Sequence, residues 1–217
     1  MTLSELTALL FHEINYNLPG SEAHRLMAPY KRPTANSIKK SHNNAKLSAV
    51  LMLIYPKENI PHFTLIQRTA YNGTHGGQIS FPGGKQEGNE SLKETALRET
   101  FEEIGVAPDK IQVLGEITQI YIPPSNFLVS PFIGFVDYEP VFTREVKEVE
   151  EIIEVKISDL TDDSNIKQKK IKVGKQAEKQ VLIDVPYFEL NYETVWGATA
   201  TILSEVRQML INTIKPA

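Results

Sequence analysis

The chain has 217 residues, of which 41% are hydrophobic and 23% charged, and these proportions are ordinary for a folded globular protein. Its formal net charge of −4 gives no support to nucleic acid as a partner. The sequence contains no cysteine, which excludes disulfides, zinc–thiolate sites and thiol nucleophiles.

Segments that would direct the chain to a membrane or an organelle are not evident. No run approaches the roughly 20 apolar residues needed to cross a bilayer, so we expect no membrane partner. The N-terminal stretch carries Glu5 and Glu13 and lacks the basic start of a secretory signal. The C-terminal sequence Ile-Lys-Pro-Ala is not a peroxisomal address. We therefore expect a cytoplasmic protein.

Two parts are predicted along the chain. Residues 1–44 are expected to form a helix at 2–15 and then an irregular extension at 18–44, and residues 45–217 to form one domain. Strands and helices are mixed there without strict alternation, which favours an α/β or α+β fold with a mixed sheet. Apolar runs bounded by turn residues and helical apolar periods predict strands at 47–55, 63–68, 78–81, 111–121, 131–137, 151–157 and 180–185, and helices at 91–104 and 197–213.

The clearest predicted helix spans residues 91–104. Ser91 and Glu94 form a capping box, and Gly105 stands where a C-terminal cap belongs. Successive residues advance by about 100° around a helix, so apolar residues three or four apart share one side. The side expected to face the core carries Leu97, Phe101 and Ile104.

Three glutamates, Glu99, Glu102 and Glu103, fall on another side of this helix. A solvated acidic face is the simpler interpretation. However, Glu99 and Glu103 are like charges four residues apart, and all three lie in the last turns, where the helix dipole disfavours negative charge. A divalent cation would convert this repulsion into a binding site. Carboxylate oxygens suit Mg²⁺ or Mn²⁺.

Arg98 and the loop at 82–90 are the neighbours of this acidic side. Arg98 can form a surface salt bridge with Glu94 or Glu102, which is the simpler interpretation. Alternatively, its guanidinium fixes a carboxylate of the facing loop. In that loop Gly83 and Gly84 let the backbone approach a ligand or offer a carbonyl to a metal, although a Gly-Gly pair is often only a turn.

Loop and helix together follow a fixed spacing. The pattern is Gly84, five residues, Glu90, seven residues, Arg98-Glu99, two residues, Glu102-Glu103, one residue and Gly105-Val106. This resembles the Nudix box, G-x5-E-x7-R-E-U-x-E-E-x-G-U, in which U is apolar and is here Thr100 at its first position. The resemblance implies a Nudix-type α/β/α sandwich with a mixed sheet and metal-dependent hydrolysis of a diphosphate bond.

The resemblance also implies roles for the box residues. Glu90 and Arg98 would form the structural pair that holds loop to helix. A carboxylate must take the proton of the attacking water, and Glu148, outside the box, is one candidate for this base. Two box residues, Glu99 and Glu103, remain the other candidates. The ligands of Mg²⁺ or Mn²⁺ would be the carboxylates of Glu99, Glu102 and Glu103 and the carbonyl of Gly84.

Segments flanking the box resemble the coenzyme A pyrophosphatase subgroup. They are residues 77–84 (Gly-Gln-Ile-Ser-Phe-Pro-Gly-Gly), 123–134, 148–160 and 195–200. Gly73 stands where the subgroup usually carries arginine. The resemblance implies cleavage of coenzyme A or acyl-CoA to 4′-phosphopantetheine and 3′,5′-ADP, and we expect the substrate to contact Arg68, His75, Gln78, Ser80 and Phe81.

Simpler interpretations exist for several of these side chains. A loop histidine such as His75 is often only solvated, and a single aromatic residue such as Phe81 is more often packing. Lysines between residues 167 and 175 could meet a 3′-phosphate, but we prefer an edge strand that lysines protect from aggregation.

Two alternative functions remain open. One is a Nudix pyrophosphatase for ADP-ribose, NADH or nucleoside triphosphates. This alternative remains because Gly73 replaces the arginine that is usual in the coenzyme A subgroup. The other is a non-catalytic Nudix-fold nucleotide sensor. The presence of every box carboxylate argues against this alternative. The expected partner is a small nucleotide substrate, and a homodimer is expected by resemblance alone.

Overall fold

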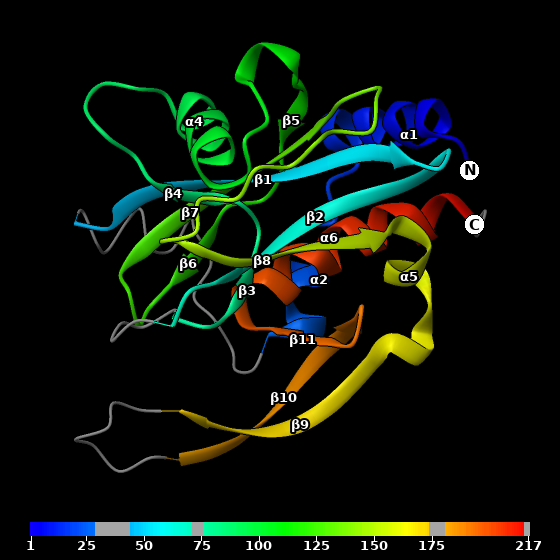
Figure 1. The fold of residues 1–217 in the computed structure, drawn as a ribbon. Helices are drawn as coiled ribbons and strands as arrows, with labels where there is room; N and C mark the ends of the chain where they lie inside the picture. The colour runs from blue at the N-terminus through cyan, green and yellow to red at the C-terminus, as the bar shows by residue number, and fades with distance from the viewer. Residues whose placement is uncertain (29–43, 71–75, 174–180, 215–217) are drawn as a thin grey trace.

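The computed structural model describes residues 1–28, 44–70, 76–173 and 181–214 (Figure 1). Its helices are α1 (Leu3–Tyr16), α2 (Gly20–Met27), α4 (Leu92–Ile104), α5 (Ile157–Thr161) and α6 (Gly197–Ile214), with 3₁₀ turns η1 (Pro108–Lys110) and η2 (Asp163–Asn165). Its strands are β1 (Lys46–Lys57), β2 (Ile60–Arg68), β3 (Ile79–Ser80), β4 (Gly83–Lys85), β5 (Gln112–Glu116), β6 (Ile120–Ile122), β7 (Phe127–Phe135), β8 (Val149–Lys156), β9 (Ile166–Val173), β10 (Val181–Leu190) and β11 (Glu193–Trp196). Within these ranges no helix is long and apolar enough to cross a membrane.

The central sheet is mixed, as predicted. Its main order is β3-β2-β1-β7-β5, and β8, β4 and β6 pair with β2, β1 and β7 respectively. Strands β1 and β7 run parallel from the Lys46–Phe127 pair to the Ile54–Phe135 pair, whereas the other pairs in this sheet are antiparallel. The parallel pair puts the end of β1 and the end of β7 at the same edge of the sheet.

Helices cover both faces of this sheet. Strand β1 is buried on both sides, and its side chains alternate between two cores. Met52 and Ile54 join the core that contains residues of α1, α2 and α6, whereas Leu51 and Leu53 join the core beneath α4. Figure 1 shows α4 on one side of the sheet and α6 with α2 on the other. The chain therefore forms the α/β/α arrangement expected from the sequence.

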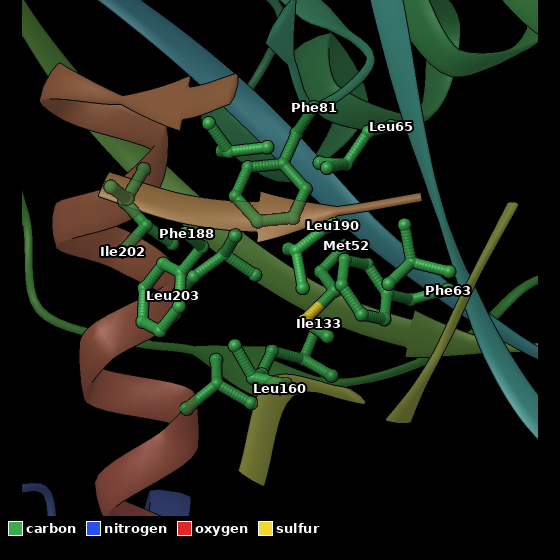
Figure 2. Close-up of a cluster of buried hydrophobic side chains, with 14 of the residues drawn as sticks. Met52, Phe63, Leu65, Phe81, Ile133, Leu160, Phe188, Leu190, Ile202 and Leu203 are labelled. Carbon is green, nitrogen blue, oxygen red and sulfur yellow. The ribbon is translucent and has the colours of Figure 1, made fainter. Parts of the chain in front are cut away.

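Figure 2 shows the larger of the two cores. Met52 and Phe63 from the sheet meet Leu203 from α6 and Phe188 from β10, and all four are almost fully buried. Burying each such side chain contributes roughly 1.5–3 kcal/mol. This core fixes α6 and the second sheet, β11-β10-β9, to the central sheet.

The N-terminal extension is more regular than predicted. Residues 20–27 form helix α2 where we expected irregular structure, and this prediction is wrong. The helix buries Ala23 and Met27, and the Ser204 hydroxyl of α6 donates to the Ala23 carbonyl at 2.8 Å. Contacts with a helix far along the chain therefore stabilise α2, and local periodicity does not contain this information.

Strands differ from the predicted ones at several further places: β7 and β10 have other bounds than the strands predicted at 131–137 and 180–185, and β4 and β11 were not predicted. The predicted strand at 111–121 is divided into β5 and β6, which pair with different parts of β7. The described part of the Lys-rich segment, residues 167–173, lies in β9, an edge strand of the second sheet, as preferred above. Its Lys167 pairs with Glu189, and its Lys169 donates to Thr194 at 2.9 Å.

Candidate active site

Helix α4 begins and ends where the sequence predicts. The Ser91 hydroxyl accepts the Glu94 N–H at 3.2 Å, and the Glu94 carboxylate accepts the Ser91 N–H at 2.7 Å. Gly105 follows the last helical residue at φ 80°, a left-handed conformation that favours glycine, and its N–H donates to the Phe101 carbonyl. These caps fix the end of the helix and the direction of its last-turn carboxylates.

The buried face of α4 differs from the predicted one. Ile104 is buried as expected, but Phe101 is 51% exposed, so this part of the predicted stripe is wrong. Thr100 and Glu103 take its place on the buried face. The Thr100 hydroxyl donates to the Ala96 carbonyl at 2.7 Å, so this side chain is buried without an unsatisfied donor.

Glu103 is the buried carboxylate of the site, with its side chain only 1% exposed. One oxygen accepts the Gly83 N–H at 2.8 Å, and the other accepts Nη1 of Arg68 at 2.8 Å. Burial raises the pKa of Glu103 to about 7, although the Arg68 charge and the Gly83 N–H act in the opposite direction. Glu103 thereby ties the last turn of α4 to β2 and β4.

Glu99 lies against Gly84. A Cβ built on Gly84 would meet the Glu99 carboxyl carbon and both carboxyl oxygens at 2.4 Å, so only glycine fits this arrangement. Burial raises the pKa of Glu99, Arg98 lowers it, and the charges of Glu102 and Glu148 raise it further. These carboxylates are therefore close enough to repel one another.

Arg98 joins the helix to the loop before it. Its Nε and Nη2 donate to the two Glu90 oxygens at 3.0 and 2.8 Å, and Nη2 also donates to the Lys85 carbonyl at 3.2 Å. The Arg98 guanidinium lowers the pKa of Glu90 to about 2. Its Nη1 contacts Glu99 and Glu102, each at 2.9 Å. One guanidinium therefore holds a loop carboxylate and two helix carboxylates.

The donors that the box resemblance assigns to a cation are all oxygens, from Gly84, Glu99, Glu102 and Glu103. In the described part of the chain, no three acidic or histidine side chains converge closely enough to hold an ion as they stand. Instead, each carboxylate contacts a guanidinium: Arg98 contacts Glu99 and Glu102, and Arg68 contacts Glu103. The oxygen chemistry and mutual repulsion of the carboxylates nevertheless fit a hard divalent cation.

Glu148 reaches the same region from the loop before β8. Its carbonyl accepts the Thr69 N–H at 2.9 Å, which ties this loop to the end of β2. Its side chain is 56% exposed, and its carboxylate lies 3.9 Å from Nη2 of Arg68. Since its charge also raises the pKa of Glu99, Glu148 shares the site with the helix carboxylates.

The predicted substrate-contacting residues do not all reach the site. Arg68, Gln78 and Ser80 lie on or beside the paired strands β2 and β3, which lead into the Gly-Gly turn. The Ser80 hydroxyl is buried and has no hydrogen-bond partner among the described residues. Phe81 is buried within the larger core, so its assignment is corrected: it packs and is not available to a substrate. His75 and Gly73 lie outside the described residues.

Sequence reasoning missed the partners of Glu103. The contact with Gly83 joins residues 20 apart in the chain, and the contact with Arg68 joins residues 35 apart. The one available signal was the Gly-Gly pair, which indicated a close backbone approach but not the group that approaches.

Known proteins resemble this chain over most of its length. Residues 45–172 match the NUDIX domain family. Nudix hydrolase 3 of Caenorhabditis elegans is 26% identical, covering 78% of this chain and 75% of its own. The protein named "Uncharacterized Nudix hydrolase NudL" of Photorhabdus laumondii is 30% identical, covering 79% of this chain and 89% of its own. A solved structure, the MutT protein of Methanosarcina mazei, has a TM-score of 0.49 at 17% identity and covers 78% of this chain and 96% of its own.

The domain match covers more than half of the chain, and it includes the whole loop–helix segment from Gly84 to Val106. The NudL relative reaches 30% identity over most of both chains. The chain therefore belongs to the Nudix hydrolase family, pyrophosphohydrolases of nucleoside diphosphate derivatives that generally use divalent metal ions.

Proposed function

We propose that this protein hydrolyses the diphosphate bond of coenzyme A or acyl-CoA, giving 4′-phosphopantetheine and 3′,5′-ADP, with Mg²⁺ or Mn²⁺. The observation that carries the proposal is a contact between two segments that resemble the coenzyme A pyrophosphatase subgroup. The Thr199 hydroxyl, in the segment 195–200, donates to the Ile79 carbonyl, in the segment 77–84, at 2.9 Å. The segment 77–84 contains Gly83, whose N–H donates to the Glu103 carboxylate.

Binding of the cation is proposed for Glu99, Glu102, Glu103 and the Gly84 carbonyl. A bound divalent ion would offset the charge of the diphosphate and acidify a water molecule. The chain's own task is to hold these oxygens in place. Gly84 leaves room for the Glu99 carboxylate, and Gly83 and Arg68 hold Glu103. Glu90 and Arg98 keep the loop against the helix.

In the proposed reaction, a water oxygen attacks one phosphorus atom and the bridging P–O bond of the diphosphate breaks. The water proton passes to a carboxylate, for which Glu148, Glu99 and Glu103 are the candidates. Glu148 is the exposed member of this set and can meet a water molecule from solvent. The substrate would contact Arg68, Gln78, Ser80 and His75, since Phe81 is buried in the core.

Two other functions are tested by the same assay. ADP-ribose, NADH or a nucleoside triphosphate would be preferred if the glycine at position 73, in place of the subgroup's arginine, shifts specificity. A non-catalytic sensor would bind nucleotides without cleaving them. The complete set of box carboxylates favours catalysis over sensing.

The experiment measures Mg²⁺- and Mn²⁺-dependent turnover of coenzyme A, ADP-ribose, NADH and dGTP by the purified full chain. Glu102→Gln removes a proposed ligand, and Glu87→Gln is its control, an exposed loop glutamate outside the fixed box positions. We expect coenzyme A to be cleaved best by the wild type and Glu87→Gln, and not by Glu102→Gln. Preference for another diphosphate would overturn the assignment of coenzyme A as the substrate. Binding of a nucleotide without cleavage would support the sensor function.

A further inference from the structure

Arg68 occupies a position between the carboxylates of the site. It ends strand β2, and its Nη1 donates to Glu103 at 2.8 Å and approaches the Gly83 carbonyl at 3.4 Å. Its Nη2 lies 3.9 Å from Glu148. One guanidinium therefore contacts a box carboxylate, the Gly-Gly turn and a carboxylate outside the box.

The two acidic partners of Arg68 are unequal. The Glu103 side chain is almost completely buried, whereas more than half of the Glu148 side chain is exposed. Charges attract far more strongly in a protein interior than where water screens them, and the pair at 3.9 Å is also the longer one. Arg68 is therefore mainly the counter-charge of Glu103.

We propose that Arg68 is a positioning residue that holds the place of the divalent cation: its guanidinium orients the Glu103 carboxylate while no cation is bound, and its positive charge weakens cation binding. This inference rests on the metal assignment in the proposed function. It adds preparation of the metal site to the substrate contact proposed for Arg68 above.

The geometry supports this role in two ways. Among the described residues, the Glu103 carboxylate accepts only one other direct hydrogen bond, from the Gly83 N–H, so without Arg68 this buried carboxylate would face a neutral donor alone. Glu99 lies four residues earlier on the same helix, at a spacing where like charges repel, and Arg68 offsets this repulsion at Glu103. A cation and a guanidinium at this carboxylate also repel each other, so each reduces the affinity of the site for the other.

The test compares Arg68→Gln, which removes the charge, with Arg68→Lys, which keeps it. Lys57→Gln is the matched control, because Lys57 forms an ion pair with Glu154 at 2.8 Å on β1 and β8, away from the box. The thermal midpoint Tm is measured in the full chain with EDTA and with saturating Mn²⁺. The Mn²⁺ dissociation constant is measured from the electron paramagnetic resonance signal of free Mn²⁺.

We expect Arg68→Gln to have a lower Tm than the wild type in EDTA, and saturating Mn²⁺ to restore at least half of this loss. The Tm loss of Lys57→Gln should be the same in EDTA and in Mn²⁺. Mn²⁺ should bind about tenfold more tightly to Arg68→Gln than to the wild type, as expected when a positive charge close to the site is removed. Arg68→Lys should restore the wild-type dissociation constant.

Different results separate the two proposals. If the wild type binds Mn²⁺ but Arg68→Gln binds it equally or more weakly, Arg68 does not compete with the cation and the inference is overturned. The same conclusion follows if Mn²⁺ does not reduce the Tm loss. If the wild type neither binds Mn²⁺ nor gains Tm from it, the metal assignment of the proposed function fails, and the inference fails with it.

Discussion

Gly84 and Glu99 approach each other so closely that a methyl group on Gly84 would lie 2.4 Å from the Glu99 carboxyl carbon. In Gly84→Ala the flexible carboxylate must move, while the backbone at Gly84 is not in the left-handed region and remains unstrained. We expect activity to fall about 100-fold, because an ångström of misplacement can have this effect, while Tm changes little. Turnover and Tm are measured on the same preparation.

Gly88→Ala is the control for this prediction. Gly88 has φ 51°, where a side chain costs about 1–2 kcal/mol, but a Cβ there would meet nothing within 4 Å. We therefore expect Gly88→Ala to lose stability and keep activity, the reverse of Gly84→Ala. Equal activity in the two variants would show that the position of Glu99 does not matter.

Glu90→Gln tests the link between loop and helix. Since Arg98 lowers the pKa of Glu90 from 4.5 to about 2, the folded state favours the ionised carboxylate. This contribution to stability is fully present above the unfolded pKa and is lost as the pH falls through about 2. We expect Glu90→Gln to be less stable by about 1–3 kcal/mol at pH 7, and the difference to shrink between pH 4.5 and 2.

Urea denaturation at several pH values measures this difference. Glu87→Gln, three residues earlier and exposed, should behave as the wild type throughout. A deficit in Glu90→Gln that is as large at pH 2.5 as at pH 7 would mean that the carboxylate charge is not its cause.

Glu205 is a second buried carboxylate, on α6, and it connects the N-terminal extension to the domain. It accepts the Gly20 N–H at 2.9 Å and the Thr118 hydroxyl at 2.6 Å, and it lies 2.9 Å from Nε2 of His24. We expect Glu205→Ala to lose about 3–5 kcal/mol, because several buried donors lose their acceptor. Calorimetry measures the loss. Glu22→Ala, an exposed glutamate on α2, should lose less than about 0.5 kcal/mol.

The same residues explain why α2 was not predicted. Its eight residues include only three apolar side chains other than glycine, Ala23, Leu26 and Met27, too few for a clear period. The helix is stabilised by Glu205 and Ser204, about 180 residues later in the chain. By contrast, α4 carries its own start and stop signals, and these placed it within one residue.

The site shows the same division between local and distant information. The resemblance to the Nudix box implied that Glu90 and Arg98 hold the loop to the helix, and Arg98 indeed donates to Glu90 and to its helix neighbour Glu99. The inward direction of Glu103 could not be predicted from an apolar wheel, which selected Phe101. Glu103 can be buried because its carboxylate accepts hydrogen bonds from Gly83 and Arg68, which lie on the strands β4 and β2. Periodicity detects apolar faces and misses a polar side chain whose partners are distant in the sequence.

Glu148→Gln identifies the proton acceptor of the proposed reaction. Glu148 is exposed, reaches the site from outside the box and is not a proposed metal ligand, so its loss should leave Mn²⁺ binding unchanged. If Glu148 is the base, we expect kcat to fall by about 10²–10⁴ with little change in KM. The control is Glu150→Gln, an exposed glutamate two residues later, which should keep wild-type kcat. If Glu148→Gln retains wild-type kcat, the base is Glu99 or Glu103, whose replacement should lower both kcat and Mn²⁺ affinity.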